Sequence, residues 1–452
     1  MLGTSYHFRE GDNMKSIDYA GEYVYQNEKL SNGAPLIIAP VKGSKTTTIT
    51  IGYKAGAFYE EGFGSGSYDG ISHFLEHMFF KGTPNLSTKE INDSFTRLGA
   101  MLNAFTANEM TVYFAKVPMR NIEGAIELWG EMLNNIQLQK EEFELERQVV
   151  LQEEKIGRDN PLHYALHRVG AMLFKGTQLE HDIIGTQSSL KGITMDMMDK
   201  YIDTYYIPEN SVIAISGGVS DEIKSKVEQE FCQKSREITN GMKKINPWST
   251  INPNWEGVHE YGYKEMNRPL SYAAFEWAGY SSNKDLLYPL ELLETYIDES
   301  KTSLFYKKLV SKGICPSAGL YFSKYPNVFS ATSYFITMPQ LVPKVHKIII
   351  EEILKKVASL EVTEELLEKL KLELLGRRIL SWEDNISLAL DHVTKTIYQG
   401  DISGAREYIL GIQEVSTAEL KEAIALLFQD VNWSLYIAGA IPASWEPPLG
   451  LQ

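Results

Sequence analysis

Apolar and polar residues recur with two different periods along the first half of the chain. Residues 36–41 and 46–54 are rich in apolar and β-branched residues, and the second segment alternates as strands do. Residues 101–117 have the pattern of a pair of strands. The apolar positions of 121–135 and 140–157 recur instead at the spacing of amphipathic helices. The pattern predicts a mixed α+β structure for this half.

The same order of strand-like and helical segments returns in the second half, and two local matches support a repeat. The letters RDN at 158–160, followed by LHYALHRV, resemble EDN at 383–385, followed by SLALDHV. Residues 207–219 resemble residues 428–440 in the same way. Because both matches have nearly the same offset, we expect an α+β fold of two homologous halves, each an antiparallel-rich sheet covered by helices.

A segment near the middle of the chain interrupts this texture. Residues 236–256 are rich in Asn, Pro and Thr and have no sustained apolar period. We therefore expect a linker at 236–256, an N-terminal half at 1–235 and a homologous C-terminal half at 257–452. The length of 452 residues agrees with this division, because single cores rarely grow beyond about 250–300 residues.

Composition and charge refine this picture mainly by exclusion. A net charge of −15 argues against a nucleic-acid-binding surface. No uninterrupted apolar stretch reaches about 18 residues, so we expect no membrane insertion. The N-terminal residues 1–25 lack the apolar core of a signal peptide. The two cysteines, Cys232 and Cys315, are too few for a disulfide framework, and we expect a cytoplasmic protein with free thiols.

The most distinctive chemistry lies in the pentapeptide HFLEH at 73–77. On a helix, residues i and i+4 share a face, so His73 and His77 present two imidazoles to one metal ion. Glu76 stands beside the pair, where it can accept a proton from a zinc-bound water whose pKa is lowered to about 7. The order H-x-x-E-H is the inverse of a common zinc-peptidase motif. The pattern predicts a Zn2+ cofactor with Glu76 as the general base.

A third zinc ligand has to come from another part of the fold, because a catalytic zinc usually has three protein ligands and an open fourth position. The helix expected at 140–157 is the richest source of candidates. Glu146 and Glu153 share a face of this helix, whereas Glu154 points about 100° away. The spacing suggests one carboxylate that binds the metal and one behind it that orients a histidine, without deciding between them.

Three segments together resemble a known family. They are HFLEHMFFKGT at 73–83, NAFTANEMTVY at 103–113 and ERQVVLQEE at 146–154. In these segments the chain is similar to the pitrilysin, insulysin and mitochondrial processing peptidase superfamily of zinc peptidases. The order of the segments and the two similar halves extend the resemblance over nearly the whole chain. Its length resembles that of the short-chain bacterial and processing-peptidase branch.

The resemblance assigns a role to each candidate residue. It implies that His73 and His77 bind zinc and that Glu76 is the general base. It also implies that Glu153 is the third zinc ligand and that Glu146 is a supporting acid.

The resemblance implies a mode of substrate binding as well. The segment around Asn103, Ala104 and Phe105 is expected to form an edge strand, to which a peptide substrate in extended conformation adds by main-chain pairing. Main-chain pairing is a physically reasonable way to bind many different sequences.

The chain departs from the family pattern in its second half. Single-chain members have an Arg and a Tyr there that hold the substrate carbonyl, and segment 302–317 corresponds to that region. Ser303 stands at the Arg position and Pro316 at the Tyr position. Neither residue replaces a guanidinium or a phenol, and the loss of one oxyanion donor can cost about 100- to 1000-fold in rate.

This departure raises the question of a partner. Some processing peptidases are heterodimers in which a homologous subunit supplies the Arg and the Tyr. We therefore favour a zinc-bearing subunit of a heterodimer over the rival reading, a homodimer or a monomer with altered activity. A non-catalytic scaffold or core subunit of the same fold is the alternative function. The intact set of His73, Glu76, His77 and Glu153 favours a metallopeptidase that acts on peptides, and the sequence does not specify the natural substrate.

Overall fold

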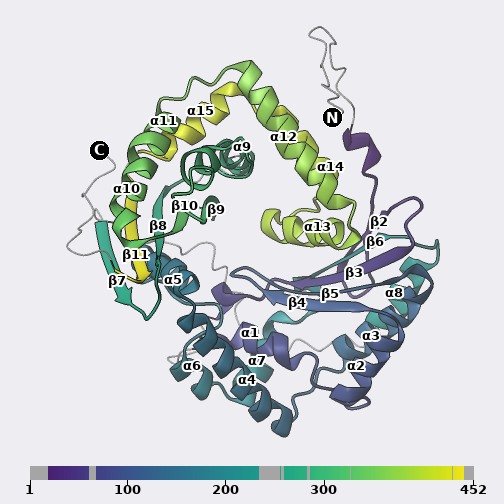
Figure 1. The fold of residues 1–452 in the computed structure, drawn as a ribbon. Helices are drawn as coiled ribbons and strands as arrows, with labels where there is room; N and C mark the ends of the chain where they lie inside the picture. The colour runs from purple at the N-terminus through teal and green to yellow at the C-terminus, as the bar shows by residue number, and fades with distance from the viewer. Residues whose placement is uncertain are drawn as a thin grey trace, which may run out of the picture.

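The computed structural model of the chain describes two mixed sheets and the helices that cover them (Figure 1). The description covers residues 19–60, 68–233, 255, 259–281, 286–325, 327–429 and 431–441. The α+β fold of two similar halves is therefore as the sequence predicts. The linker expected at 236–256 lies outside the described residues except for Trp255, so the bounds of the two halves stay a prediction.

Within the described residues, the first sheet has six strands in the order β1-β2-β6-β3-β5-β4. Its strands are β1 (Gln26–Lys29), β2 (Pro35–Pro40), β3 (Thr46–Tyr53), β4 (Met101–Thr106), β5 (Thr111–Pro118) and β6 (Ser211–Gly217). Strands β2 and β6 pair in parallel, and the other pairs are antiparallel. The central strand β6 is buried along its whole length, so both faces of this sheet are covered.

The second sheet repeats this arrangement. Its strands are β7 (His259–Glu265), β8 (Ser271–Tyr280), β9 (Ser317–Lys324), β10 (Val328–Thr337) and β11 (Asn432–Gly439). Among the described residues their order is β7-β11-β8-β10-β9, which matches β2-β6-β3-β5-β4 strand for strand. The parallel pair of β7 and β11 also stands where β2 and β6 pair in parallel. The repeat predicted from two short local matches thus extends to the topology.

The helices of the first half pack mainly on one face of the first sheet. They are α1 (Ile71–Met78), α2 (Thr88–Arg97), α3 (Ile122–Asn134), α4 (Lys140–Asp159), α5 (Pro161–Leu173), α6 (Gln187–Gly192), α7 (Met195–Tyr205) and α8 (Ile223–Phe231). Local signals set several ends; helix α2, for example, begins with a capping box between Ser87 and Glu90. Stacked rings of Phe79 and Tyr113 lie in the core beneath these helices, beside Trp129.

Apart from α13, the helices of the second half share an apolar core with the second sheet. The helices of this half are α9 (Leu287–Ile297), α10 (Val342–Lys347), α11 (Lys355–Ala358), α12 (Glu364–Trp382), α13 (Asn385–Gln399), α14 (Ala405–Glu414) and α15 (Thr417–Leu426). Two π-helical segments, at Tyr306–Val310 and Ile348–Leu354, lie between them. Among the described residues, no helix is long and apolar enough to cross a membrane.

One helix of each half packs on the sheet of the other half. Helix α13 lies on β3 and β6 of the first sheet, and helix α5 lies on β8 and β11 of the second sheet (Figure 1). The N-caps of the two helices are Asn160 and Asp384, whose side chains accept main-chain N–H groups of the first turn. These are the segments whose sequences match. The exchange closes the second apolar face of each sheet.

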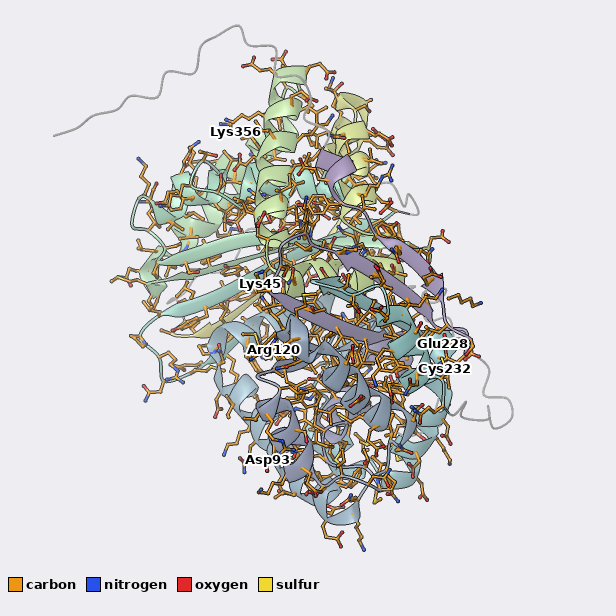
Figure 2. All side chains as sticks on the ribbon, turned by 90° about the vertical axis from the view of Figure 1, so that its right-hand side faces the viewer. Lys45, Asp93, Arg120, Glu228, Cys232 and Lys356 are labelled. Atoms are coloured by element: carbon orange, nitrogen blue, oxygen red, sulfur yellow. The ribbon has the colours of Figure 1, made fainter. Side chains whose placement is uncertain are left out.

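Polar contacts fix the exchanged helices at the joint between the halves. The side-chain amide of Asn385 donates to the carbonyl of Thr46 at 3.0 Å, and Lys116 pairs with Asp384 at 2.7 Å. The hydroxyl of Ser434 donates to the carbonyl of Val169 at 2.7 Å. In the orthogonal view, Asp93 and Lys356 lie at opposite ends of the molecule, and Lys45 lies between them near the joint (Figure 2).

The two cysteines are unpaired. Cys315 is buried in the core of the second half. Cys232 is partly buried near Glu228, at the side of the molecule that faces the viewer in Figure 2. The prediction of free thiols is confirmed.

A buried carboxyl under an exchanged helix predicts how stability depends on pH. Glu276 on β8 is 6% exposed, and burial raises its pKa from 4.5 to about 7. Because the pKa of Glu276 is raised, its protonated carboxyl contributes fully to the free energy of unfolding below pH 4.5. This contribution is lost as the pH rises through about 7. In the wild type, the free energy of unfolding should therefore decline over this pH range. We expect Glu276→Gln to remove up to about 3 kcal/mol of the decline, and urea unfolding at a series of pH values measures it.

The matched control is Glu260→Gln on β7, where the side chain is exposed. This variant should follow the wild-type dependence of the unfolding free energy on pH. Parallel curves for wild type and Glu276→Gln would contradict the assignment.

Candidate metal centre

Helix α1 carries the pentapeptide, and its apolar residues decide which way the histidines face. Ile71, Phe74, Leu75 and Met78 are buried, at the spacing that places one stripe of a helix in the core. His73 and His77 therefore lie on the opposite face of α1. The helix packs against α4 and β4. The ring of Phe74 stacks on Phe143 of α4, with centroids 4.8 Å apart, so the two helices approach each other closely.

The N-terminus of α1 is capped by a carboxylate from an earlier segment. Gly70 has φ 90°, a conformation that favours glycine, and a Cβ there would collide with the carbonyl of Ile184. The carboxylate of Glu60 accepts the N–H groups of Gly70 and Ser72, both at 2.9 Å. Burial raises the pKa of Glu60 to about 8, and these hydrogen bonds oppose the rise. Sequence reasoning missed Glu60, because the glycine-rich segment separates it from the helix.

The structure brings His73, His77 and Glu153 together. The Oε2 of Glu153 lies 3.9 Å from the Nε2 of His73 and 3.4 Å from the Nε2 of His77. Among the described residues, these are the only three potential ligands whose atoms all lie within 4.8 Å of one another. Two imidazoles and one carboxylate form a donor set that suits a catalytic zinc with one open position.

The protonation of His73 agrees with this donor set. Burial and the neighbouring His77 lower the pKa of His73 to about 4. The imidazole is therefore neutral near pH 7, as a metal ligand must be.

Glu146 lies behind His77. Its Oε1 is 2.9 Å from the Nδ1 of His77, and its Oε2 is 2.5 Å from the Nζ of Lys81. With Nδ1 bonded to a carboxylate, the Nε2 of His77 is directed at Glu153 with its lone pair available. The neighbouring Glu154 pairs instead with Arg158. The structure thus separates the three glutamates as the helical spacing suggests, and it adds Lys81, which sequence reasoning missed although it lies within the quoted segment 73–83.

Glu76 lies on the same helix and is held from the side of the sheet. The hydroxyl of Thr106 on β4 donates to its Oε2 at 2.6 Å. Burial raises the pKa of Glu76, and the hydrogen bond from Thr106 opposes the rise. A carboxylate with a raised pKa is suited to accept and release a proton near neutral pH. Thr106 was also missed, although it follows Phe105 directly in the family-like segment.

Asn103, Ala104 and Phe105 lie on β4, which is the edge of the described sheet next to α1. The N–H of Ala107 donates to the carbonyl of Met110 at 2.7 Å, which fixes the hydrogen-bonding register of the hairpin. In this register the main-chain groups of Ala104 point away from β5, toward the open edge. The N–H of Ala104 donates to the Oδ1 of Asn103 at 2.9 Å.

The two substituted positions lie around the helix–strand connection that precedes β9. Ser303 is buried, and its Oγ accepts the N–H of Tyr306 at 3.3 Å within the same half. Pro316 is exposed and immediately precedes β9, the counterpart of β4 in the second sheet. The roles of all these site residues stay predictions, and the geometry shows only which of them lie together.

Comparison with known proteins identifies the family. A sequence model of the insulinase family, peptidase family M16, matches residues 37–187. A second model, described as the peptidase M16 inactive domain, matches residues 192–374. The chain belongs to the M16 peptidase family. The first matched segment contains α1, β4 and α4, and the resemblance predicted from the sequence is confirmed.

Individual relatives agree with this placement. An uncharacterized zinc protease, YmxG, of Bacillus subtilis (strain 168) is 28% identical over 80% of this chain and 84% of its own length. The mitochondrial-processing peptidase subunit beta of Mus musculus is 32% identical over 46% of this chain and 43% of its own length. The crystal structure of a protease from Helicobacter pylori, 20% identical, superposes with a TM-score of 0.80 over 92% of this chain and all of that chain. The last similarity shows the fold alone.

The two adjacent glutamates of α4 provide a matched test of the metal centre. We expect Glu153→Gln to weaken zinc binding by at least about 100-fold, because loss of a ligand should exceed the effect of a supporting partner. Glu154→Gln should leave zinc binding unchanged, because Glu154 pairs with Arg158. Competition with a chromophoric chelator measures both dissociation constants. Equal losses in the two variants would contradict the assignment of Glu153.

Proposed function

We propose that this chain is the zinc-bearing subunit of a metalloendopeptidase that hydrolyses peptides in extended conformation. The observation that carries the proposal is the convergence of His73, His77 and Glu153, with Glu76 on the same helix and an edge strand beside it. Two relatives are named as zinc proteases, which supports the same proposal.

His73, His77 and Glu153 would hold the metal. Bound zinc would polarise the scissile carbonyl and lower the pKa of water to about 7. Glu76 accepts the proton of the attacking water and then donates it to the leaving nitrogen. The hydroxyl of Thr106 holds the carboxylate of Glu76 in place during both transfers.

The substrate lies along β4. The outward main-chain groups of Ala104 and Thr106 pair with an extended peptide, which becomes an additional strand of the sheet. The side chain of Asn103, bonded to the N–H of Ala104, is displaced when the peptide pairs there. Because Thr106 contacts Glu76, this pairing brings a peptide bond to the catalytic carboxylate. Main-chain pairing selects for extended conformation more than for sequence.

A partner subunit supplies the oxyanion donors. Ser303 and Pro316 stand where single-chain members have an Arg and a Tyr, and Ser303 is occupied by a local hydrogen bond. The similarity to a subunit named mitochondrial-processing peptidase beta supports a heterodimer, with a homodimer as the rival assembly. The alternative function is a non-catalytic scaffold of the same fold. A scaffold would not need a neutral His73 that faces the carboxylate of Glu153, with Glu76 on the same helix. This arrangement therefore favours the enzyme.

The base assignment predicts a separation of metal binding from catalysis. Glu76→Gln should retain one equivalent of zinc and lose hydrolysis by about 100- to 10,000-fold, the range of general acid–base catalysis. The loss follows because an amide cannot accept the proton of the attacking water. Metal analysis and a fluorogenic-peptide assay measure the two properties, with the exposed Glu123→Gln on α3 as the control. A variant that keeps its activity would remove Glu76 from this role, and a wild type that binds no zinc would favour the scaffold.

The partner requirement predicts weak activity for the isolated chain. We expect the purified chain to turn over unstructured peptides more slowly than about 0.1 per second, because typical enzymes reach about 10 per second and an oxyanion donor is worth about 100-fold or more. Sedimentation in the same buffer reports the assembly state. Turnover of several per second by the isolated chain would contradict the need for a homologous partner.

A further inference from the structure

Hydrogen bonds connect the strand ends beside the β4–β5 turn to the catalytic carboxylate of Glu76 and to the segment before α1. Thr106, the last residue of β4, donates to Glu76 at 2.6 Å, and its Oγ1 lies 3.5 Å from the Oγ1 of Thr111. The hydroxyl of Thr111 donates to the carbonyl of Ala55 at 2.6 Å. Residues 107–110 join the two strands, so a displacement of this turn moves Thr106, the hydrogen-bond partner of Glu76.

The same turn is joined to the start of the metal-binding helix. Its carbonyls at Ala107 and Asn108 accept the N–H groups of Ala57 and Phe58, at 3.2 and 2.9 Å. These donors belong to the short 3-10 helix η2 (Ala57–Tyr59), which leads directly into Glu60, the cap of α1. Close contact needs glycine at position 56, because a Cβ there would collide with the carbonyl of Ala107.

The second half reaches this turn through α13. The hydroxyl of Tyr398, near the end of α13, donates to the Oε2 of Glu109 at 3.1 Å. Glu109 is 4% exposed, and burial raises its pKa to about 7, whereas the hydrogen bond from Tyr398 lowers it. Met110 is buried in the same apolar cluster as Val393 and Ile397 of α13.

We propose that Tyr398 is a positioning residue of the active site, which fixes the β4–β5 turn through Glu109 and thereby orients Glu76. The inference rests on the proposed function for its catalytic consequence. The hydroxyl of Tyr398 reaches the turn at Glu109, so we place its effect on Glu76 through the turn. The residue is 48% exposed, so its apolar burial contributes less to folding than that of a core tyrosine. The part of Tyr398 that acts on the turn is therefore its hydroxyl, which donates to the buried carboxylate of Glu109.

Removing the hydroxyl alone tests the proposal in the native assembly. Tyr398→Phe should lower kcat by about three- to tenfold, because a small misplacement of a catalytic group is costly. The KM and the zinc dissociation constant should stay within about twofold, because the substitution leaves the three candidate ligands and the β4 edge in place. Glu109→Gln should keep most of the kcat, since its amide oxygen still accepts the hydroxyl. Glu109→Leu should match Tyr398→Phe, and the double variant should be no worse than either.

Amide hydrogen exchange provides a readout that does not depend on activity. In Tyr398→Phe, exchange of residues 101–110 should be about tenfold faster, the effect of one lost hydrogen bond. The matched control is Tyr263→Phe on β7, which is also exposed and should change neither exchange in this segment nor kcat.

The outcomes separate the inference from the proposed function. Unchanged kcat or unchanged exchange in Tyr398→Phe would overturn the positioning role, as would a Glu109→Gln variant as damaged as Glu109→Leu. If the wild-type assembly hydrolyses no peptide, the proposed function fails. Exchange then decides alone whether Tyr398 fixes the turn.

Discussion

The reciprocal packing of α5 and α13 is the constraint on which the rest of the structure depends. Each sheet has two apolar faces, and the helices of its own half cover one of them. Among the described residues, the helix from the opposite half packs on the other face. Because apolar burial is the dominant favourable term in folding, neither half completes its core alone. The candidate metal centre depends on this packing too, since a single residue, Asn160, separates α5 from α4, which carries Glu146 and Glu153.

Features that depend on spacing within one element could be predicted from the sequence. His73 and His77 share a helical face wherever that helix lies, and the buried stripe of α1 directs them away from the core. The face shared by Glu146 and Glu153 was also predictable, but the order of the two was not. Their spacing is the same read in either direction, so only the resemblance to a family distinguished the ligand from the supporting acid.

Features that depend on partners far along the chain could not be predicted in this way. The matching segments at 158–160 and 383–385 indicated a repeat, and the structure places them at the start of both exchanged helices. An apolar stripe does not say which sheet will cover it. The polar partners were missed for the same reason. Lys81, Thr106 and Glu60 become informative only when the fold places them against Glu146, Glu76 and the end of α1.

The charges around the candidate metal centre distinguish carboxylates that are otherwise alike. The charge of Glu146 is offset by Lys81, so it can support His77 without competing for the metal. Glu153 is more exposed and faces two imidazoles, of which His73 is neutral near pH 7. Burial and the neighbouring Glu153 make the negative charge of Glu76 costly, and its pKa is raised for this reason. A divalent cation bound there would offset the charges of both carboxylates. In the proposed centre, the same residue type would therefore serve as support, ligand or proton carrier according to what surrounds it.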